Sequence, residues 1–247
     1  PTTSSAASDV YKRQALLSKY QLLNKRLGQI SEGKEAWLKH CQRYSDGRIH
    51  GSVLTNACVS GRCSHRNPNI ANVPRVGAPY GAECRALFHA PHGWRQVGCD
   101  ASGLELRALG AQLAFFDGGE YAKLVSKEDF DIHTHNAKLF GIYDGQGEIE
   151  KQTRELAKRL IYSVLYGGGP FRVGSILDPS LSERKQKEIG YETIDTFYKN
   201  LPAIKKLKDK VDEKVTQRGY LIGIDGRHLQ IRSRHSALNQ LLQSTGS

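Results

Sequence analysis

The chain has 247 residues, which is long enough for one large domain or two small ones. No apolar run is long enough to span a membrane, and no charged start followed by an apolar run indicates secretion, so we expect a cytoplasmic protein. A net charge of +11 favours nucleic acid as partner over an acidic membrane surface, and five cysteines without a Cys-x-x-Cys pair argue against disulfides and structural zinc.

The first residues differ in character from the rest of the chain. Asp9 to Gln14, DVYKRQ, is similar to an in-frame translation of the transposon end used in building sequencing libraries. We therefore expect residues 1–14 to be a non-native scar or a disordered terminus, and the chain to be a fragment. From Leu16 to Tyr44 the apolar spacing predicts an amphipathic helix or helix pair, interrupted around Gly28 to Gly33. Ile49 to Val53 predicts a short strand.

Residues 55–91 are rich in Gly, Pro, Asn and Arg, which predicts irregular backbone. Six side chains with hydrogen-bond donors crowd into this stretch: Arg62, His65, Arg66, Asn67, Asn69 and Asn72. Such a set suits phosphates and minor-groove base edges. The alternative is a polar surface loop that uses Asn for its turns.

Asp100 lies at a predicted corner of the chain. Val97 to Cys99 predicts the end of a short apolar strand, Ala101 to Gly103 a tight turn, and Leu104 to Leu113 a helix. A carboxylate at such a corner, beside small residues, can hold a divalent cation. The alternative is that Asp100 only caps the helix.

Asp131 to His135, DIHTH, follows a predicted helix at Tyr121 to Ser126. The close spacing of its acidic and imidazole side chains is compatible with metal ligands. However, His133 and His135 are two residues apart and cannot share a helix face. A phosphate contact or an ordinary first helical turn is therefore favoured over zinc.

Glu148 to Tyr166 predicts a helix with one polar face. Four residues on that face recur at every fourth position: Arg154, Lys158, Tyr162 and Tyr166. Two cations followed by an aromatic ring can grip a triphosphate and stack on a base or sugar, whereas the alternative is an ordinary solvated basic face. The sequence Gly167-Gly168-Gly169-Pro170 ends this helix.

The last third of the chain predicts two more helices, at Leu181 to Lys199 and Pro202 to Arg218, the second of them heavily basic. Asp225-Gly226 between two short apolar runs predicts a hairpin. A final helix is expected from His235 to Gln243, with His235, Asn239 and Gln243 on one polar face.

Three segments together resemble the polymerase region of family A DNA polymerases: DASGLELR at 100–107, TRELAKRLIYSVLYG at 153–167 and HSALNQLLQS at 235–244. Among them the chain is most similar to replicative polymerases of podovirus-type phages, over about Lys25 to Ser247. The resemblance implies an α+β fold with right-hand architecture, in which the palm has an antiparallel sheet, the fingers are helical and most of the thumb is absent. It also implies the cytoplasm of an infected host cell as the location.

The resemblance assigns roles to single residues. Asp100 resembles the motif A carboxylate that binds two catalytic Mg²⁺ ions, with the Ala101 carbonyl as a further ligand. Glu105 resembles the gate against ribonucleotides and is expected to lie against the Tyr162 ring, below the nucleotide sugar. The expected triphosphate contacts are His133, Arg154 and Lys158. The expected DNA contacts are Arg62, Asn69, Asn72, Tyr166, Gly167, His235, Asn239 and Gln243.

The resemblance also implies subdomains and partners. The implied subdomains are entry helices at the end of the thumb (15–45), palm (46–135), fingers (136–218) with the nucleotide-binding helix at 148–166, and a return to the palm with the start of a truncated helix (219–247). The implied partners are primer-template DNA, deoxynucleoside triphosphates and a processivity factor on the absent thumb, but no membrane.

One family motif is missing from the sequence. The family's second metal-binding Asp lies in a His-Asp-Glu tripeptide, which the sequence does not contain. We therefore expect a DNA-directed DNA polymerase as the parent and an inactive fragment here. The alternatives are an enzyme similar to the single-subunit phage RNA polymerases and a non-catalytic DNA-binding fragment.

Overall fold

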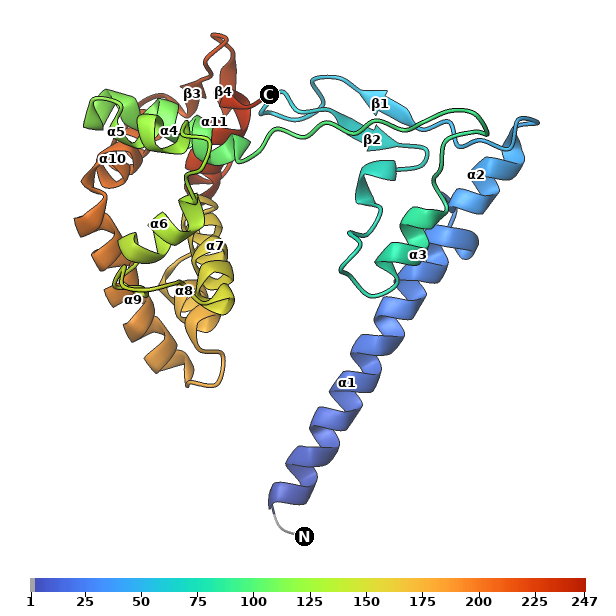
Figure 1. The fold of residues 1–247 in the computed structure, drawn as a ribbon, viewed down its shortest axis with the longest axis horizontal. Coiled ribbons are helices and arrows are strands. Elements are labelled where there is room, and N and C mark those ends of the chain that lie inside the picture. Colours follow the sequence, from blue (N-terminus) through green and yellow to red (C-terminus); the bar gives the residue numbers. More distant parts are fainter. Residues whose placement is uncertain (1–2) are drawn as a thin grey trace. The chain divides into compact units, whose positions relative to one another are not determined.

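The computed structural model describes the backbone of residues 3–247 and the side chains of residues 12–247. Its contacts divide the chain into two compact units (Figure 1). Unit 1 comprises Pro1–Ala57 and Cys63–Cys99, and unit 2 comprises Cys58–Arg62 and Asp100–Ser247. Each unit has its own two-stranded antiparallel sheet, in agreement with the expected α+β class.

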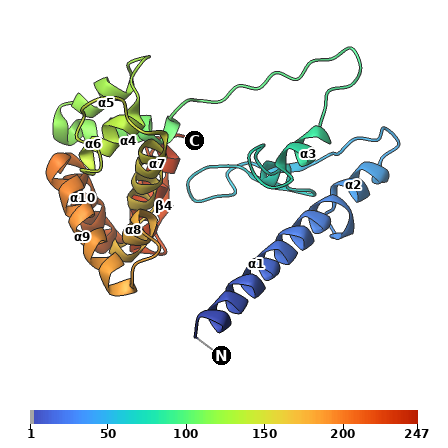
Figure 2. The ribbon, with the colours of Figure 1, turned by 60° about the horizontal axis from the view of Figure 1, so that its bottom comes forward.

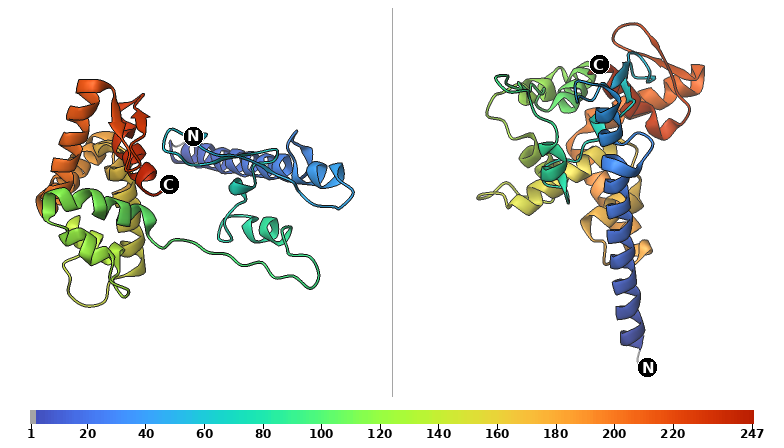
Figure 3. Two further views of the ribbon diagram at one scale, coloured as in Figure 1. Left: turned by 90° about the horizontal axis from the view of Figure 1, so that it is seen from above. Right: turned by 90° about the vertical axis from the view of Figure 1, so that its right-hand side faces the viewer.

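Unit 1 begins with one long helix. Helix α1 (Thr3–Leu27) passes through a π-helical turn, η1 (Gly28–Glu32), toward α2 (Trp37–Arg43), so the predicted interruption near Gly28 is confirmed (Figure 3). Of the segment predicted as a scar or disordered terminus, Pro1 and Thr2 lie outside the described residues. The rest of it is helical, and its non-native origin stays a prediction.

The other elements of unit 1 are short: β1 (Ser52–Leu54), β2 (Ser64–Arg66), η2 (Ile70–Asn72) and α3 (Gly81–Ala86). Strand β1 pairs with β2 in antiparallel register, with Ser52 opposite Arg66. Between these elements the backbone is irregular, as the Gly, Pro and Asn content predicts.

Unit 2 is mostly helical (Figure 2). Its helices are α4 (Leu104–Asp117), α5 (Glu120–Val125), α6 (Ile132–Leu139), α7 (Lys151–Leu165), α8 (Pro170–Leu177), α9 (Glu183–Asn200), α10 (Pro202–Arg218) and α11 (Ala237–Thr245). The predicted hairpin is formed by β3 (Tyr220–Ile222) and β4 (His228–Gln230), and a 3-10 turn, η3 (Arg234–Ser236), precedes α11. No helix in the part of the chain that the structure describes is long and apolar enough to cross a membrane.

The core of unit 2 fixes the position of α7. Helix α6 packs on α7, α8 packs on both α7 and α9, and α4 packs on α5, α10 and α11. Leu160 and Ile161 of α7 are fully buried, as are Leu109 and Leu113 of α4. Complete burial of such a side chain is worth about 1.5–3 kcal/mol. The apolar face of α7 is therefore held against the core, and its polar face points outward.

Two sequence-based expectations about local structure are wrong. Val97 to Cys99 is irregular and exposed, because a strand needs a neighbour for its backbone hydrogen bonds and no strand of the described residues pairs with this segment. Helix α8 was not predicted. The Gly-Gly-Gly-Pro run predicts only the end of α7, but Pro170 also occupies the first turn of α8, where a missing N–H costs nothing.

Candidate active site

Helix α7 presents its polar residues on one face because its opposite face is apolar and buried. Along the polar face Arg154 is half-buried, Lys158 is exposed and Tyr162 is half-buried. The helix ends before Gly167, whose φ of 80° is the left-handed conformation that favours glycine. A Cβ at Gly167 would collide with the backbone carbonyl of His235, so glycine is also needed for this close approach.

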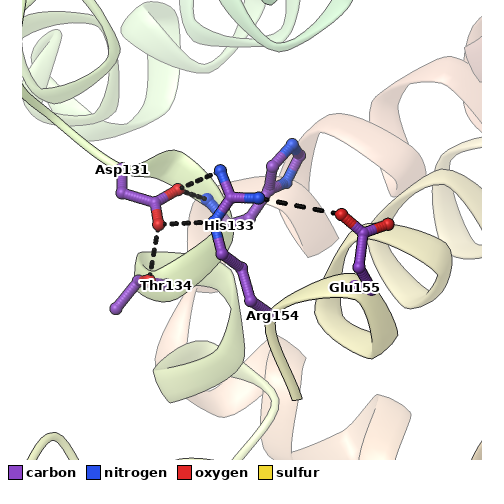
Figure 4. Close-up of polar contacts among 5 residues, drawn as sticks. All are labelled: Asp131, His133, Thr134, Arg154 and Glu155. Atoms are coloured by element: carbon purple, nitrogen blue, oxygen red, sulfur yellow. Dashed lines mark hydrogen bonds and ion pairs between the residues drawn. The ribbon is translucent and has the colours of Figure 1, made fainter. Parts of the chain in front are cut away.

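Arg154 is held by a carboxylate from the neighbouring helix (Figure 4). Its Nε donates to Oδ2 of Asp131 at 2.7 Å, and its Nη2 donates to Oδ1 at 3.0 Å. Asp131 also caps α6, because Oδ1 accepts from the backbone N–H of His133 at 3.1 Å and Oδ2 accepts from Oγ1 of Thr134 at 2.7 Å. Burial alone would raise the pKa of Asp131, but these bonds outweigh it and hold that pKa well below its usual range.

His133 lies beside Arg154 in the first turn of α6 (Figure 4). Its burial, followed by the charges of Arg154 and Lys158, lowers the pKa of the imidazole. The ring is therefore mostly neutral at neutral pH, until an anion offsets the two cations. The ring of His135 packs instead against Phe130, with the two ring centroids 5.3 Å apart, so the two histidines are in different surroundings.

Glu105, in the first turn of α4, is bound at both of its oxygens. The hydroxyl of Tyr166 donates to Oε2 at 2.6 Å, and Nη2 of Arg62 donates to Oε1 at 3.2 Å. The expected position of Glu105 against the Tyr162 ring stays a prediction; burial and then the charge of Glu105 raise the pKa of Tyr162. Burial and then the bond to Glu105 raise the pKa of Tyr166, so its hydroxyl remains a donor. The centroids of the Tyr162 and Tyr166 rings lie 5.8 Å apart.

Asp100 is exposed and does not cap α4. The residue before this helix is Gly103, and no side chain caps the helix there, so the alternative interpretation of Asp100 as a cap is wrong. Within the described residues, no three His, Cys, Asp or Glu side chains lie close enough together to bind one metal ion. Mg²⁺ often takes only one or two carboxylates and completes its shell with water and substrate phosphates. Asp100 and the Ala101 carbonyl thus fit as part of a metal site.

The residues expected to contact DNA are distributed over both units. In unit 1, Asn69 caps η2 by accepting from Ala71 N–H at 3.1 Å, and the Asn72 carbonyl accepts from Gln29 Nε2 at 3.3 Å. In unit 2, Arg62 and Tyr166 meet at Glu105.

The remaining expected DNA contacts lie near the end of the chain. His235 is exposed in η3, and on α11 Gln243 Nε2 donates to Asn239 Oδ1 at 3.0 Å. Unit 2 thus brings Gln243 and Asn239 together on one helix face.

Sequence reasoning considered Asp131 to His135 as metal ligands, a phosphate contact or a first helical turn, but it did not connect Asp131 or Thr134 with Arg154. The only signal is local, since Asp before an apolar helix predicts an N-cap. The bond from Asp131 to Arg154 links residues 23 positions apart, and no spacing rule pairs them.

A family model described as DNA polymerase family A matches residues 6–246. The DNA-directed DNA polymerases of Enterobacteria phage T3 and Escherichia phage T7 are each 40% identical over 94% of this chain and 33% of their own length. The DNA polymerase I of Chloroflexus aurantiacus is 32% identical over 73% of this chain and 18% of its own. The chain thus spans about a third of the length of the phage relatives.

A solved structure has the same fold. It is the POL domain of Pol1 from M. smegmatis, in complex with DNA primer-template and dNTP. The TM-score is 0.65 at 21% identity, over 84% of this chain and 37% of that one. This similarity confirms the expected polymerase fold, while the division into palm and fingers at particular residues stays a prediction.

Proposed function

This chain belongs to DNA polymerase family A, and from that premise we propose that it is part of a DNA-directed DNA polymerase. The proposed reaction transfers a deoxynucleotide from its triphosphate to a primer 3′-hydroxyl, as directed by a template strand. One observation carries the proposal: Arg154 and Lys158 lie on successive turns of one helix face, with His133 beside them. Three basic groups converge there, as a triphosphate requires.

The chain's own residues would act on the phosphates. Arg154 and Lys158 neutralise the negative charge that grows as pyrophosphate leaves, and charge partners of this kind act mainly in the transition state. His133 is able to take up a proton when the triphosphate offsets its cationic neighbours. Two Mg²⁺ ions, held in part by Asp100 and the Ala101 carbonyl, would supply activation of the 3′-hydroxyl and charge neutralisation at the phosphates.

Sugar selection would fall to Glu105. A side chain fixed by both Tyr166 and Arg62 has little freedom to move aside for a ribose 2′-hydroxyl. Discrimination of this kind rests on an unfavourable contact with the wrong substrate.

Primer-template DNA is the proposed macromolecular partner. The net charge of +11 supports a polyanion, and the Arg, Asn, His and Gln side chains described above suit the minor groove, where hydrogen-bond acceptors are nearly the same for every base pair. A processivity factor stays a prediction.

A grafted polymerase tests the proposal. In it, residues 25–247 of this chain replace the matching segment of the phage T7 relative, which supplies the rest of the enzyme. We expect template-dependent primer extension. Lys158→Ala should lower kcat/KM by about 10²-fold, as expected when a transition-state charge partner is lost.

Two variants make the test specific. Arg159→Ala removes an exposed cation one residue on, about 100° around the same helix, and should change the kinetics little. Asp100→Asn should abolish extension without weakening DNA binding. A folded grafted polymerase that binds DNA but never extends a primer would favour the non-catalytic alternative. Preference for ribonucleotides would favour the alternative of an RNA polymerase.

A further inference from the structure

We propose that Asp131 is a positioning residue of the triphosphate site, which holds the Arg154 guanidinium beside His133 before the nucleotide arrives. This inference rests on the proposed function, since it names a residue that acts through Arg154. Nothing in the sequence pattern or the family resemblance connects Asp131 with Arg154.

The carboxylate of Asp131 is fully occupied by this chain (Figure 4). Each oxygen accepts two hydrogen bonds: Oδ1 from His133 N–H and Arg154 Nη2, and Oδ2 from Thr134 Oγ1 and Arg154 Nε. An ionised carboxylate has about four acceptor positions, so none is left for another ligand. Asp131 is therefore fixed to the first turn of α6, and Arg154 is fixed to Asp131.

Arg154 still has donors to offer while it is held. A guanidinium carries five N–H groups, of which Asp131 uses one on Nε and one on Nη2. Nη1 lies 3.8 Å from Glu155, which is too far for a hydrogen bond. The edge formed by Nη1 and the second N–H of Nη2 is thus available to phosphate oxygens. Triphosphate binding and the bond to Asp131 are compatible.

Pre-positioning should strengthen binding for two reasons. Arg154 is held in one conformation, so less side-chain freedom is lost when the anion binds. In addition, the negative charge of Asp131 reduces the mutual repulsion of Arg154, Lys158 and a protonated His133. Removal of the charge of Asp131 should therefore weaken triphosphate binding, although it removes an anion from a site that binds anions. If Asp131 acted only by repelling the triphosphate, removal of its charge would instead strengthen triphosphate binding.

The experiment uses the whole chain and inorganic tripolyphosphate, with binding measured by isothermal titration calorimetry. Asp131→Asn keeps an N-cap, because Asn caps helices as well as Asp does, but loses the charge and one acceptor oxygen. We expect its Kd to be about tenfold higher. Glu155→Gln is the matched control: it neutralises a carboxylate that lies 3.8 Å from Arg154 Nη1, too far for a hydrogen bond, and should change Kd less than twofold, as for an exposed ion pair.

A double-mutant cycle separates positioning from structural damage. In an Arg154→Ala background, Asp131→Asn should have no further effect on Kd. In wild type, the Arg154 Nε–H signal in proton–nitrogen NMR should be protected from exchange, and Asp131→Asn should remove that protection. If Asp131→Asn fails to fold, as judged by circular dichroism, Asp131→Ser supplies the same comparison with a capping hydroxyl.

The outcomes are distinct. An unchanged or lower Kd for Asp131→Asn would overturn the positioning role and leave the triphosphate site intact. If Asp131→Asn also raises Kd in the Arg154→Ala background, Asp131 acts through α6 alone. That result would overturn the positioning role as well. Absence of tripolyphosphate binding by the folded wild-type chain would contradict both the triphosphate site of the proposed function and the role of Asp131.

Discussion

Glu105 is fixed at two points, by the Tyr166 hydroxyl and by the Arg62 guanidinium. Tyr166 directly follows α7, whereas Arg62 lies in the loop between β1 and β2, and both belong to unit 2. If Glu105 is the gate of the proposed function, it is selective only while it stays in place, so the residues that hold it should also affect sugar selection.

Tyr166→Phe should therefore relax sugar discrimination in the grafted polymerase. The change removes one hydrogen bond to a carboxylate, so ribonucleotide incorporation should rise by about three- to tenfold, equivalent to about 1 kcal/mol. Glu105→Ala should have a larger effect, because it removes the obstacle itself. The measurement is competitive incorporation of a ribonucleotide against its deoxynucleotide.

Tyr162→Phe is the matched control, since it removes a hydroxyl one helical turn away that makes no hydrogen bond within the described residues. It should leave ribonucleotide discrimination unchanged and penalise dideoxynucleotides by about 1–3 kcal/mol, if the Tyr162 hydroxyl lies under the sugar. Equal effects of both tyrosine changes on ribonucleotides would refute the idea that Tyr166 holds the gate.

At the scale of elements, Asp131 joins two helices, since it caps α6 and binds α7 through Arg154. The ion pair has 38% side-chain exposure at both partners, so solvent screens it and we expect only about 1 kcal/mol from it at neutral pH. The folded state lowers the pKa of Asp131, so this contribution is complete above the unfolded pKa of about 3.9 and is lost as pH falls toward the folded value.

Asp131→Asn should consequently lower the free energy of unfolding at about pH 7 and have a smaller effect at about pH 3, where the unfolded wild-type chain already binds a proton at this carboxylate. Urea unfolding at both pH values measures the difference. Glu183→Gln breaks the surface pair with Lys187 on α9 and should have little effect at either pH. An Asp131→Asn penalty that grows on acidification has the wrong sign and would contradict the assignment.

Long periodic segments and the hairpin with its Asp-Gly turn could be predicted from the sequence, but helix α8 and the contacts between separate segments could not. Helix α10 begins at Pro202 and ends at Arg218, as predicted, because its apolar spacing continues over several turns. Helix α8 has eight residues and begins at the proline of a Gly-Gly-Gly-Pro run, which is typical of a helix end as well as of a helix start. The same holds for the candidate site. That Arg154 and Lys158 share one helix face follows from their spacing in the sequence. The hydrogen bonds to Asp131 and Glu105 depend on how separate segments fold together, so they could not be predicted.

For the whole molecule, the distribution of buried apolar residues is unequal. Every member of the buried apolar cluster among the described residues belongs to unit 2, where Leu109, Leu113 and Leu160 are completely buried. The fully described part of unit 1 buries few apolar side chains, chiefly Trp37 and Cys84. Since apolar burial is the main favourable term in folding, unit 1 should be the less stable of the two.

The two tryptophans allow this difference to be measured, because both Trp37 and Trp94 lie in unit 1. Trp37 is 4% exposed and contacts Phe88, whereas Trp94 is 75% exposed and can be replaced by Phe at little cost. In the Trp94→Phe chain, fluorescence therefore reports the unfolding of unit 1 alone. We expect the fluorescence transition in urea to precede the main circular dichroism transition, which the helices of unit 2 dominate.

A core variant of unit 2 tests whether the transitions are separate. Leu113→Ala leaves a cavity at a fully buried site and should destabilise unit 2 by about 2–5 kcal/mol. It should move the dichroism midpoint to lower urea and leave the fluorescence midpoint of Trp37 in place, as long as unit 2 remains the more stable unit. Coincident transitions that Leu113→Ala shifts together would instead mean that the two units unfold as one cooperative body, and that unit 1 draws its stability from unit 2.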